Sequence, residues 1–248
     1  AKLGANVVVE PFASIHRNVV IGDGTWIGAN VVINEGARIG KNCRIFPGAV
    51  ISAIPQALKF VGEETTAVIE DGTTIREFVT ISRGTVDKYT TVIGKNCLLM
   101  AYVHVGHDCI IGDNCILGNV VQLAGHVEVE DYVIFGGACA VQQFSRIGAH
   151  AYIGGGSLVR KDVPPFVKAA REPLSYSGIN SVGLRRRGFT NEQINEIQEM
   201  YRYVYLRGLN NADAISAIEG KLPVSAERDQ VVDFIRNSER GIMRGSGE

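Results

Sequence analysis

Residues 92–115 read VIGKNCLLMAYVHVGHDCIIGDNC, and a large apolar residue returns every six positions, at Ile93, Leu99, Val105 and Ile111. From residue 3 to residue 159, 24 of the 27 positions in this phase are Ile, Leu, Val or Phe, and the exceptions are Ala57, Glu63 and Asp87. A period of six fits neither a helix nor a plain strand. It therefore predicts a repeating supersecondary unit, the coil of a parallel β-helix.

The repeat also predicts the shape of each coil. Three apolar anchors in a triangular cross-section give about 18 residues per coil, so that residues 18 apart stack at about 4.8 Å. A Gly follows the anchor at eleven places, where we expect a tight corner at which a Cβ would be unwelcome. The residue four positions after the anchor is usually small or β-branched, which predicts a narrow bore.

Two domains follow from where the repeat stops. We expect a solenoid over residues 1–165, with a loop thrown out at 54–67, a shorter break at 83–91, and Pro164 and Pro165 at its end. Residues 166–248 form the second domain, which is helical. A capping box, Thr190-Asn-Glu-Gln193, predicts a helix to about residue 206, and two more helices are expected over 212–218 and 226–236.

Composition excludes several classes of partner. The 25 basic and 26 acidic residues nearly balance, so the overall charge gives no case for nucleic acid. No run of 18 apolar residues predicts a membrane span, and Ala1-Lys2-Leu3 does not open a secretory signal. All five cysteines follow an anchor by four residues and should point into the bore. They are expected to be reduced core residues, which favours a cytoplasmic protein.

Stacking at 18 residues gathers polar side chains at one corner. It places His107 below Gly125 and Gln143, and Asp108 below His126, with His104 close by. A general base needs an orienting carboxylate, and a glycine above it would leave a backbone N–H free for an oxyanion. The column thus predicts a base at His107. A zinc triad of His104, His107 and His126 is the metal alternative, and it is disfavoured because His104 and His107 are three apart on extended chain.

Several motifs, some of which contain these residues, occur along the chain. They are His104-Val-Gly-His-Asp-Cys109, Leu123-Ala-Gly-His-Val127, Ala140-Val-Gln-Gln-Phe144, Ile147-Gly-Ala-His150, Asp162-Val-Pro-Pro165 and Gly183-Leu-Arg-Arg-Arg-Gly-Phe189. Together they resemble the acyl-carrier-protein–UDP-N-acetylglucosamine O-acyltransferases that begin lipid A synthesis. The similarity runs from end to end. It implies a left-handed parallel β-helix of hexapeptide repeats with a C-terminal α-helical domain, although right-handed crossovers are the general rule.

The resemblance also implies an activity and its partners. An acyl carrier protein would donate a 3-hydroxyacyl chain to the 3-hydroxyl of UDP-N-acetylglucosamine, in a homotrimer with active sites between subunits and with no cofactor or metal. His107 would be the base, Asp108 its support and the Gly125 N–H the oxyanion donor. The residues matching substrate-binding positions are Lys59, His104, His126, Gln143, Asn180, Arg186 and Arg187. Basic residues near 160–171 and 185–187 are candidates for meeting the acidic carrier.

Three positions depart from the family pattern or tune it. Ala57 stands where the family commonly has Asp, a loss expected to weaken acceptor binding or catalysis. Gln142 replaces a further active-site His, a change expected to be tolerated. Gly155 matches the residue that stops the acyl chain, and the absence of a side chain there implies a chain of about fourteen carbons or more.

Other functional classes share the solenoid. The related N-acyltransferase carries an additional N-terminal domain, and acetyl-CoA-dependent acetyltransferases lack the Gly183–Phe189 stretch. A binding solenoid without catalysis would have no need of the column of His107, Gly125 and Gln143.

Overall fold

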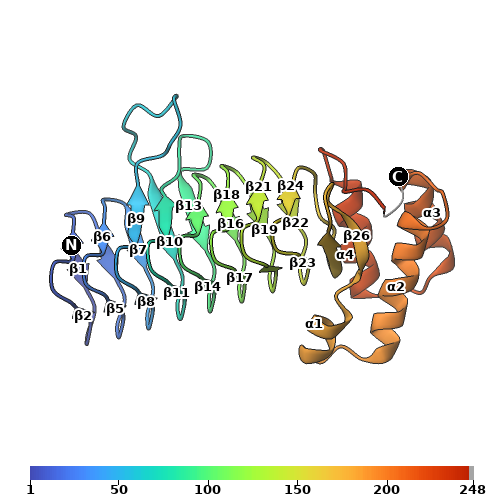
Figure 1. The fold of residues 1–248 in the computed structure, drawn as a ribbon, viewed down its shortest axis with the longest axis horizontal. Coiled ribbons are helices and arrows are strands. Elements are labelled where there is room, and N and C mark those ends of the chain that lie inside the picture. Colours follow the sequence, from blue (N-terminus) through green and yellow to red (C-terminus); the bar gives the residue numbers. More distant parts are fainter. Residues whose placement is uncertain (246–248) are drawn as a thin grey trace.

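The computed structural model describes residues 1–245 and shows a three-sided β-helix followed by four helices (Figure 1). The first sheet contains β1 (Lys2–Leu3), β4 (Val20–Ile21), β7 (Ala37–Ile39), β10 (Thr66–Ile69), β13 (Thr90–Ile93), β16 (Ile110–Ile111), β19 (Glu128–Val129) and β22 (Arg146–Ile147). The second contains β2 (Val8–Val9), β5 (Trp26–Ile27), β8 (Arg44–Ile45), β11 (Thr74–Ile75), β14 (Leu98–Leu99), β17 (Ile116–Leu117), β20 (Ile134–Phe135), β23 (Tyr152–Ile153), β25 (Val167–Ala170) and β26 (Ser175–Ile179). The third contains β3 (Ser14–Ile15), β6 (Val32–Ile33), β9 (Val50–Ala53), β12 (Thr80–Ser82), β15 (His104–Val105), β18 (Gln122–Leu123), β21 (Ala140–Val141) and β24 (Leu158–Val159).

The predicted register of 18 residues is confirmed along most of the solenoid. Val105 pairs with Leu123, and Leu123 pairs with Val141. Two insertions lengthen the step without breaking the sheet. Ile39 pairs with Ile69, a step of 30 that contains the loop after β9, and Ile69 pairs with Ile93, a step of 24 that contains residues 83–89. The excesses over 18 are 12 and 6, so each insertion is a whole number of hexads and the inward phase is preserved.

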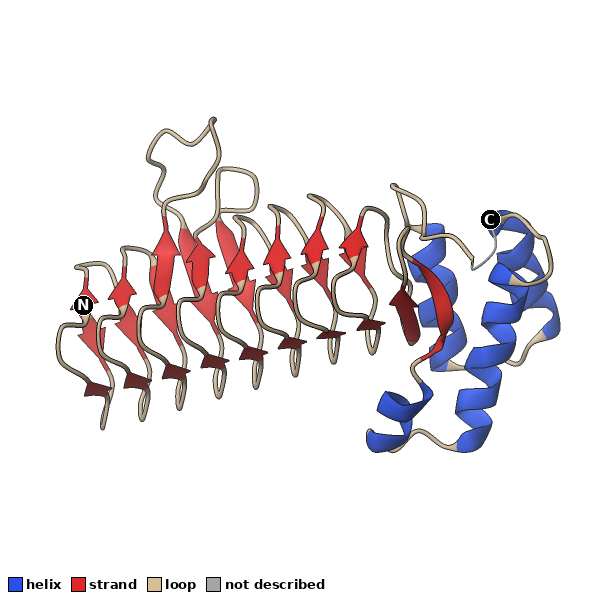
Figure 2. Cartoon of the chain, viewed as in Figure 1, coloured by secondary structure: helices blue, strands red, loops and turns tan. Residues whose placement is uncertain are grey.

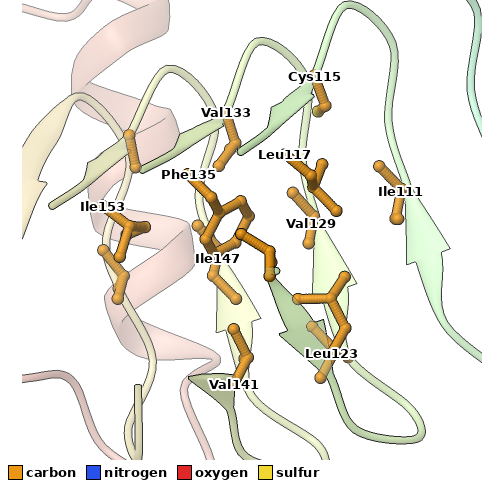
Figure 3. Packing of buried hydrophobic residues seen from close by; sticks show 14 of the residues in the cluster. Ile111, Cys115, Leu117, Leu123, Val129, Val133, Phe135, Val141, Ile147 and Ile153 are labelled. Atoms are coloured by element: carbon orange, nitrogen blue, oxygen red, sulfur yellow. The ribbon is translucent and has the colours of Figure 1, made fainter. Parts of the chain in front are cut away.

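The anchors fill the bore, as Figure 3 shows for the coils around Phe135. The anchors from Ile21 to Val159 that continue the apolar phase are at most 3% exposed. Burying each aliphatic side chain stabilises the folded state by about 1.5–3 kcal/mol relative to leaving it exposed to water. A column of such residues therefore stabilises a solenoid whose strands are mostly two residues long.

The corners turn differently from the expectation. Glycine after the anchor is needed for close approach, since a Cβ on Gly106 would lie 2.7 Å from the carbonyl carbon of Ala124 in the next coil. The left-handed backbone comes two residues later, as at Asp108 (φ 60°) and His126 (φ 62°).

We name the corners by the sheets they join: corner I from the first to the second, corner II from the second to the third, and corner III from the third to the first.

The second domain begins less abruptly than predicted. β25 continues the second sheet beside β23, and β26 then pairs with β25 in the antiparallel sense, so the sheet runs past residue 165. Figure 2 shows the helices covering this end of the solenoid. They are α1 (Ser181–Arg186), α2 (Asn191–Tyr205), α3 (Asn211–Lys221) and α4 (Ala226–Arg236).

The three predicted helices are confirmed, and the capping box at Thr190 and Gln193 is present. α1 was not predicted because a six-residue helix leaves too little periodicity. Among residues 1–245, no helix is long and apolar enough to cross a membrane.

Each of the five cysteines lies buried in the bore, and its thiol faces a carbonyl of the next coil, as with Cys109 Sγ and Ala124 O at 3.1 Å. Burial raises the pKa of Cys109 to about 12. Because all five thiols are buried, we expect a thiol reagent to modify none of them in the folded protein and all five after denaturation. Modification of any cysteine at the rate of a free thiol, without unfolding, would contradict this packing.

Candidate active site

Corner III collects the predicted column. The turns 107–108, 125–126 and 143–144 follow β15, β18 and β21 in turn, so they stack along one edge of the prism. The loop after β9 and the insertion after β12 leave from the same edge (Figure 1). The solenoid therefore places both irregular segments beside the histidines.

Asp108 is the buried centre of this corner, with no exposed surface. Its Oδ1 accepts from the backbone N–H of Thr85 (2.9 Å) and of Lys88 (3.3 Å), and its Oδ2 accepts from Thr85 Oγ1 (2.6 Å). Burial raises the pKa of Asp108, but the hydrogen bonds from Thr85, His107 and Lys88 outweigh it and hold the pKa below the ordinary value. Asp108 is thus an ionised carboxylate that ties the 83–89 insertion to the corner.

His107 completes the pair. Its Nδ1 lies 2.8 Å from Asp108 Oδ2, so the carboxylate fixes the tautomer with the proton on Nδ1 and leaves the Nε2 lone pair free. The side chain is 13% exposed, so the ring is largely shielded but still reaches the surface. This is the arrangement of an oriented general base.

Gly125 packs directly against the imidazole. A Cβ at residue 125 would lie 2.6 Å from His107 Cε1 and 2.7 Å from Nε2, so only glycine allows the ring to lie where it does. Within residues 1–245 the Gly125 N–H donates to no protein acceptor, whereas the next N–H, of His126, donates to His107 O at 2.9 Å. A free backbone donor beside His107 is the geometry that an oxyanion donor needs, and that role for Gly125 stays a prediction.

His126 lines the other side of the base. Its ring meets His107 edge-on, with centroids 5.0 Å apart, and stacks on Phe144 at 4.5 Å. Nε2 lies 3.7 Å from a carboxylate oxygen of both Asp108 and Asp87. Burial lowers the pKa of His126, against the opposing effect of Asp108. Asp87, one of the three breaks in the hexad, thus contributes a carboxylate that the sequence reasoning did not assign to the site.

His104 lies outward on β15, beside Thr80. Its Nδ1 is 2.8 Å from Thr80 Oγ1, and burial, then the nearby His107, lower its pKa. Sequence reasoning missed Thr80 and Thr85 as partners, because the 83–89 insertion changes the step from 18 to 24 (Thr80 pairs with His104). The short break in the hexad at 83–91, which contains Thr85, was the signal in the sequence that this segment departs from the plain coil.

The zinc triad considered from the sequence, His104, His107 and His126, does not form as a group. The group whose ligand atoms lie within 4.8 Å of one another is His107, Asp108 and His126, and it does not include His104. Asp108 Oδ2 already accepts from Thr85 and His107. The ligand atoms that a metal would need on Asp108 are therefore already engaged in hydrogen bonds.

A cleft of about 710 Å³ opens beside His126 and Phe144 and reaches Asn237 and Arg240 after α4. Its walls carry both charges, with Lys88 paired to Glu128 at 2.6 Å. The cleft gives solvent access to the outer side of the histidine cluster.

The remaining predicted residues lie elsewhere on the prism. Lys59 is exposed in the loop on corner III, two coils before His107, and Gln143 is exposed in the turn above Gly125. Gly155 lies in the turn between β23 and β24, on corner II. One chain therefore does not bring Gly155 to the base.

Asn180, Arg186 and Arg187 lie at corner I. Asn180 caps α1 by accepting from Gly183 N, and Arg186 is exposed on that helix. Arg187 Nη2 donates to Tyr132 O at 2.9 Å, and Tyr132 is in a corner I turn. The predicted residues are thus divided among all three corners of one chain.

Family models match both the solenoid and the C-terminal domain. Residues 18–53 and 90–125 match the bacterial transferase hexapeptide model, and residues 162–243 match the model of UDP-N-acetylglucosamine O-acyltransferase domain 2. An acyl-[acyl-carrier-protein]–UDP-N-acetylglucosamine O-acyltransferase from Anaeromyxobacter sp. is 42% identical over 200 residues, covering 80% of this chain and 78% of that protein.

Solved structures agree. The UDP-N-acetylglucosamine acyltransferase LpxA from Bacteroides fragilis is 53% identical, with a TM-score of 0.97 over 98% of this chain and 96% of that one. LpxA from Acinetobacter baumannii is 40% identical, with a TM-score of 0.95 over 98% and 95%. The predicted fold class, a left-handed β-helix with a C-terminal helical domain, is confirmed.

The solenoid of hexapeptide repeats, with a histidine–aspartate pair on its corner, defines a hexapeptide acyltransferase. More narrowly, the chain belongs to the family of acyl-[acyl-carrier-protein]–UDP-N-acetylglucosamine O-acyltransferases.

Gly125→Ala tests the packing of the base. The new Cβ would displace the His107 ring and crowd the free N–H, so we expect acyl transfer to fall about 10²–10³-fold, as for loss of an oxyanion donor. The matched control is Gly137→Ala, at the same turn position on corner II, where a Cβ would have its nearest neighbour at 3.2 Å. Both variants should melt like the wild type. Near-normal turnover by Gly125→Ala would contradict the geometry.

Thr85→Val tests the tie to Asp108. The lowered pKa of Asp108 contributes stability that is present above the unfolded pKa of about 3.9 and is lost as the pH falls through the folded pKa. Removing the hydroxyl raises the folded pKa toward the unfolded value, so at pH 7 we expect a loss of about 1–3 kcal/mol. The variant should then lose less stability than the wild type on acidification, and the difference between the two should narrow as the pH falls below about 3.9.

Urea unfolding at pH 7 and at about pH 3, below the unfolded pKa of Asp, measures both effects. Thr66→Val is the control, because Thr66 donates to Thr90 on the same edge without touching Asp108. Identical acid profiles for the two variants would refute the tie.

Proposed function

We propose that this protein transfers a (R)-3-hydroxyacyl chain from acyl carrier protein to the 3-hydroxyl of UDP-N-acetylglucosamine, the first step of lipid A synthesis. The observation that carries the proposal is the His107–Asp108 pair packed against Gly125 and its free N–H. The names of the relatives indicate the substrates. The His107–Asp108 pair offers the oriented base that the reaction requires.

In this mechanism the 3-hydroxyl oxygen attacks the thioester carbonyl carbon while His107 Nε2 takes its proton. A sugar hydroxyl has a pKa far above that of imidazole, so proton removal accompanies attack rather than preceding it. The Gly125 N–H donates to the developing oxyanion. When the tetrahedral intermediate collapses, the C–S bond breaks, and the thiolate of the carrier takes the proton from His107 and leaves as a thiol.

Asp108 acts through His107. Its buried carboxylate holds the Nδ1 proton and stabilises the imidazolium that forms during attack. No covalent acyl-enzyme is needed, and the cysteines face the bore rather than the corner.

The division of site residues among three corners supports a homotrimer. Corner III of one subunit carries the base, and corner I of another would carry Arg186 and Arg187 to the nucleotide, since one prism cannot bring its own corners together. A column of exposed apolar residues on corner II offers a contact surface for a symmetric assembly. Its members are Phe12 (87% exposed), Phe78 (51%), Tyr102 (56%) and Val120 (46%).

The other substrate contacts follow from position. Lys59 would reach the acceptor from its loop, His104, His126 and Gln143 would line the sugar and acyl site, and Asn180 would contact the nucleotide or the donor. The acidic carrier would meet basic residues near 160–171. Five buried free thiols are consistent with a reducing cytoplasm, where we place the enzyme.

The direct experiment incubates the protein with UDP-N-acetylglucosamine and hydroxyacyl carrier protein. We expect a 3-O-acyl product, and His107→Ala should lower kcat by about 10²–10⁴-fold because it removes the base. Ala57→Asp should raise activity by restoring the carboxylate that the family carries. Absence of product from both the wild type and Ala57→Asp would refute the proposal, and an N-acyl product or transfer from acetyl-CoA would favour the alternative classes.

Chain length gives a further test. Gly155 is exposed and carries no side chain, so donors of about fourteen to sixteen carbons should turn over faster than ten-carbon donors. Gly155→Met should reverse that order by filling the groove. Faster turnover of ten-carbon donors by the wild type would contradict the assignment.

A further inference from the structure

His150, the last residue of the Ile147–His150 motif, lies on corner I at the centre of a cluster of aromatic rings. Its ring stacks between Tyr132 (centroids 4.9 Å apart) and Phe166 (5.6 Å), and the edge of Phe189 meets it at 5.1 Å. These three aromatic neighbours come from two coils and from the end of α1. The ring is therefore fixed in position by packing alone.

The polar groups of His150 hold two other residues. Nδ1 lies 3.4 Å from Arg187 Nη1, and the backbone carbonyl accepts from Asn180 Nδ2 at 2.9 Å. Arg187 is held again by Tyr132, through the 2.9 Å bond to its carbonyl and a ring 5.3 Å from the guanidinium carbon. One histidine thus contacts both Asn180 and Arg187.

The ring is suited to accept a hydrogen bond. Burial, and then the neighbouring Arg187, lower the pKa of His150 to about 4, so the imidazole is neutral at pH 7. The guanidinium carries five N–H groups, and within residues 1–245 two of them have protein acceptors, which leaves three for a ligand. A planar, pre-oriented guanidinium suits the oxygens of a nucleoside diphosphate.

We propose that His150 is a positioning residue of the nucleotide site, which aims Arg187 at the diphosphate and locks Asn180 beside it. The inference rests on the proposed function, because it takes the nucleotide sugar as the ligand of corner I. His150 itself touches no substrate in this account and acts through Arg187.

Phe and Asn, two possible replacements for His150, already occupy the equivalent turn position in other coils on corner I. Phe166 occupies the next coil with φ 65°, and Asn114 lies two coils before with φ 58°. His150→Phe therefore keeps the stack and the left-handed backbone but removes the acceptor. His150→Asn keeps the backbone and an acceptor near the position of Nδ1.

We expect His150→Phe to raise the KM for UDP-N-acetylglucosamine by about 10-fold, since a hydrogen bond to a charged group is lost, with kcat and the KM of the acyl donor unchanged. His150→Asn should recover part of the loss. Calorimetry should show the same weakening for UDP but none for uridine, which lacks the phosphates. In Arg187→Ala, adding His150→Phe should cause no further loss.

The outcomes separate the two proposals. If the wild type binds UDP and His150→Phe binds it equally well, or weakens uridine and UDP alike, the positioning role is overturned while the proposed function stands. Full additivity with Arg187→Ala overturns it as well. If the wild type binds neither UDP nor UDP-N-acetylglucosamine, the proposed function falls and this inference falls with it.

Discussion

The backbone ladder between coils is the constraint on which the rest of this structure depends. Two-residue strands have almost no stability alone, and here each is held by pairing above and below and by an anchor in the bore. The ladder fixes which residues stack, because a slip of one residue would turn every anchor outward. Chemistry at a corner is consequently positioned to within the spacing of the coils.

That constraint explains why the site tolerates an unfavourable backbone. Asp108 and His126 both adopt the left-handed conformation, which costs a non-glycine residue of order 1–3 kcal/mol. Four hydrogen bonds to the Asp108 carboxylate and the stack of His126 on Phe144 offset this cost. The same turn that closes a coil therefore also orients His107 and Asp108. The 83–89 insertion adds the donors of Thr85 and Lys88 that a plain hexad would lack.

The hexad predicted the solenoid, its register and the His107–Gly125 column, because inward phase and coil length follow from apolar spacing alone. It also predicted which cysteines were structural. It did not predict Thr80 or Thr85, since both depend on an insertion whose length changes the stacking arithmetic. It placed the tight turn at the glycine after the anchor, whereas that glycine serves close approach. It passed over His150, because stacking with Tyr132, Phe166 and Phe189 is a property of packing across coils and domains that no local pattern contains.

In the proposed site, His107 on corner III and Arg187 on corner I can meet only between subunits. Complementation between two inactivated variants tests this claim. His107→Ala and Arg187→Ala proteins are unfolded together, mixed in equal amounts and reassembled. If each site takes His107 from one subunit and Arg187 from its neighbour in a three-fold assembly, random mixing should restore about a quarter of wild-type activity, measured at a low concentration of UDP-N-acetylglucosamine at which both parents turn over slowly. Mixed assemblies with no more activity than the parents would contradict the account.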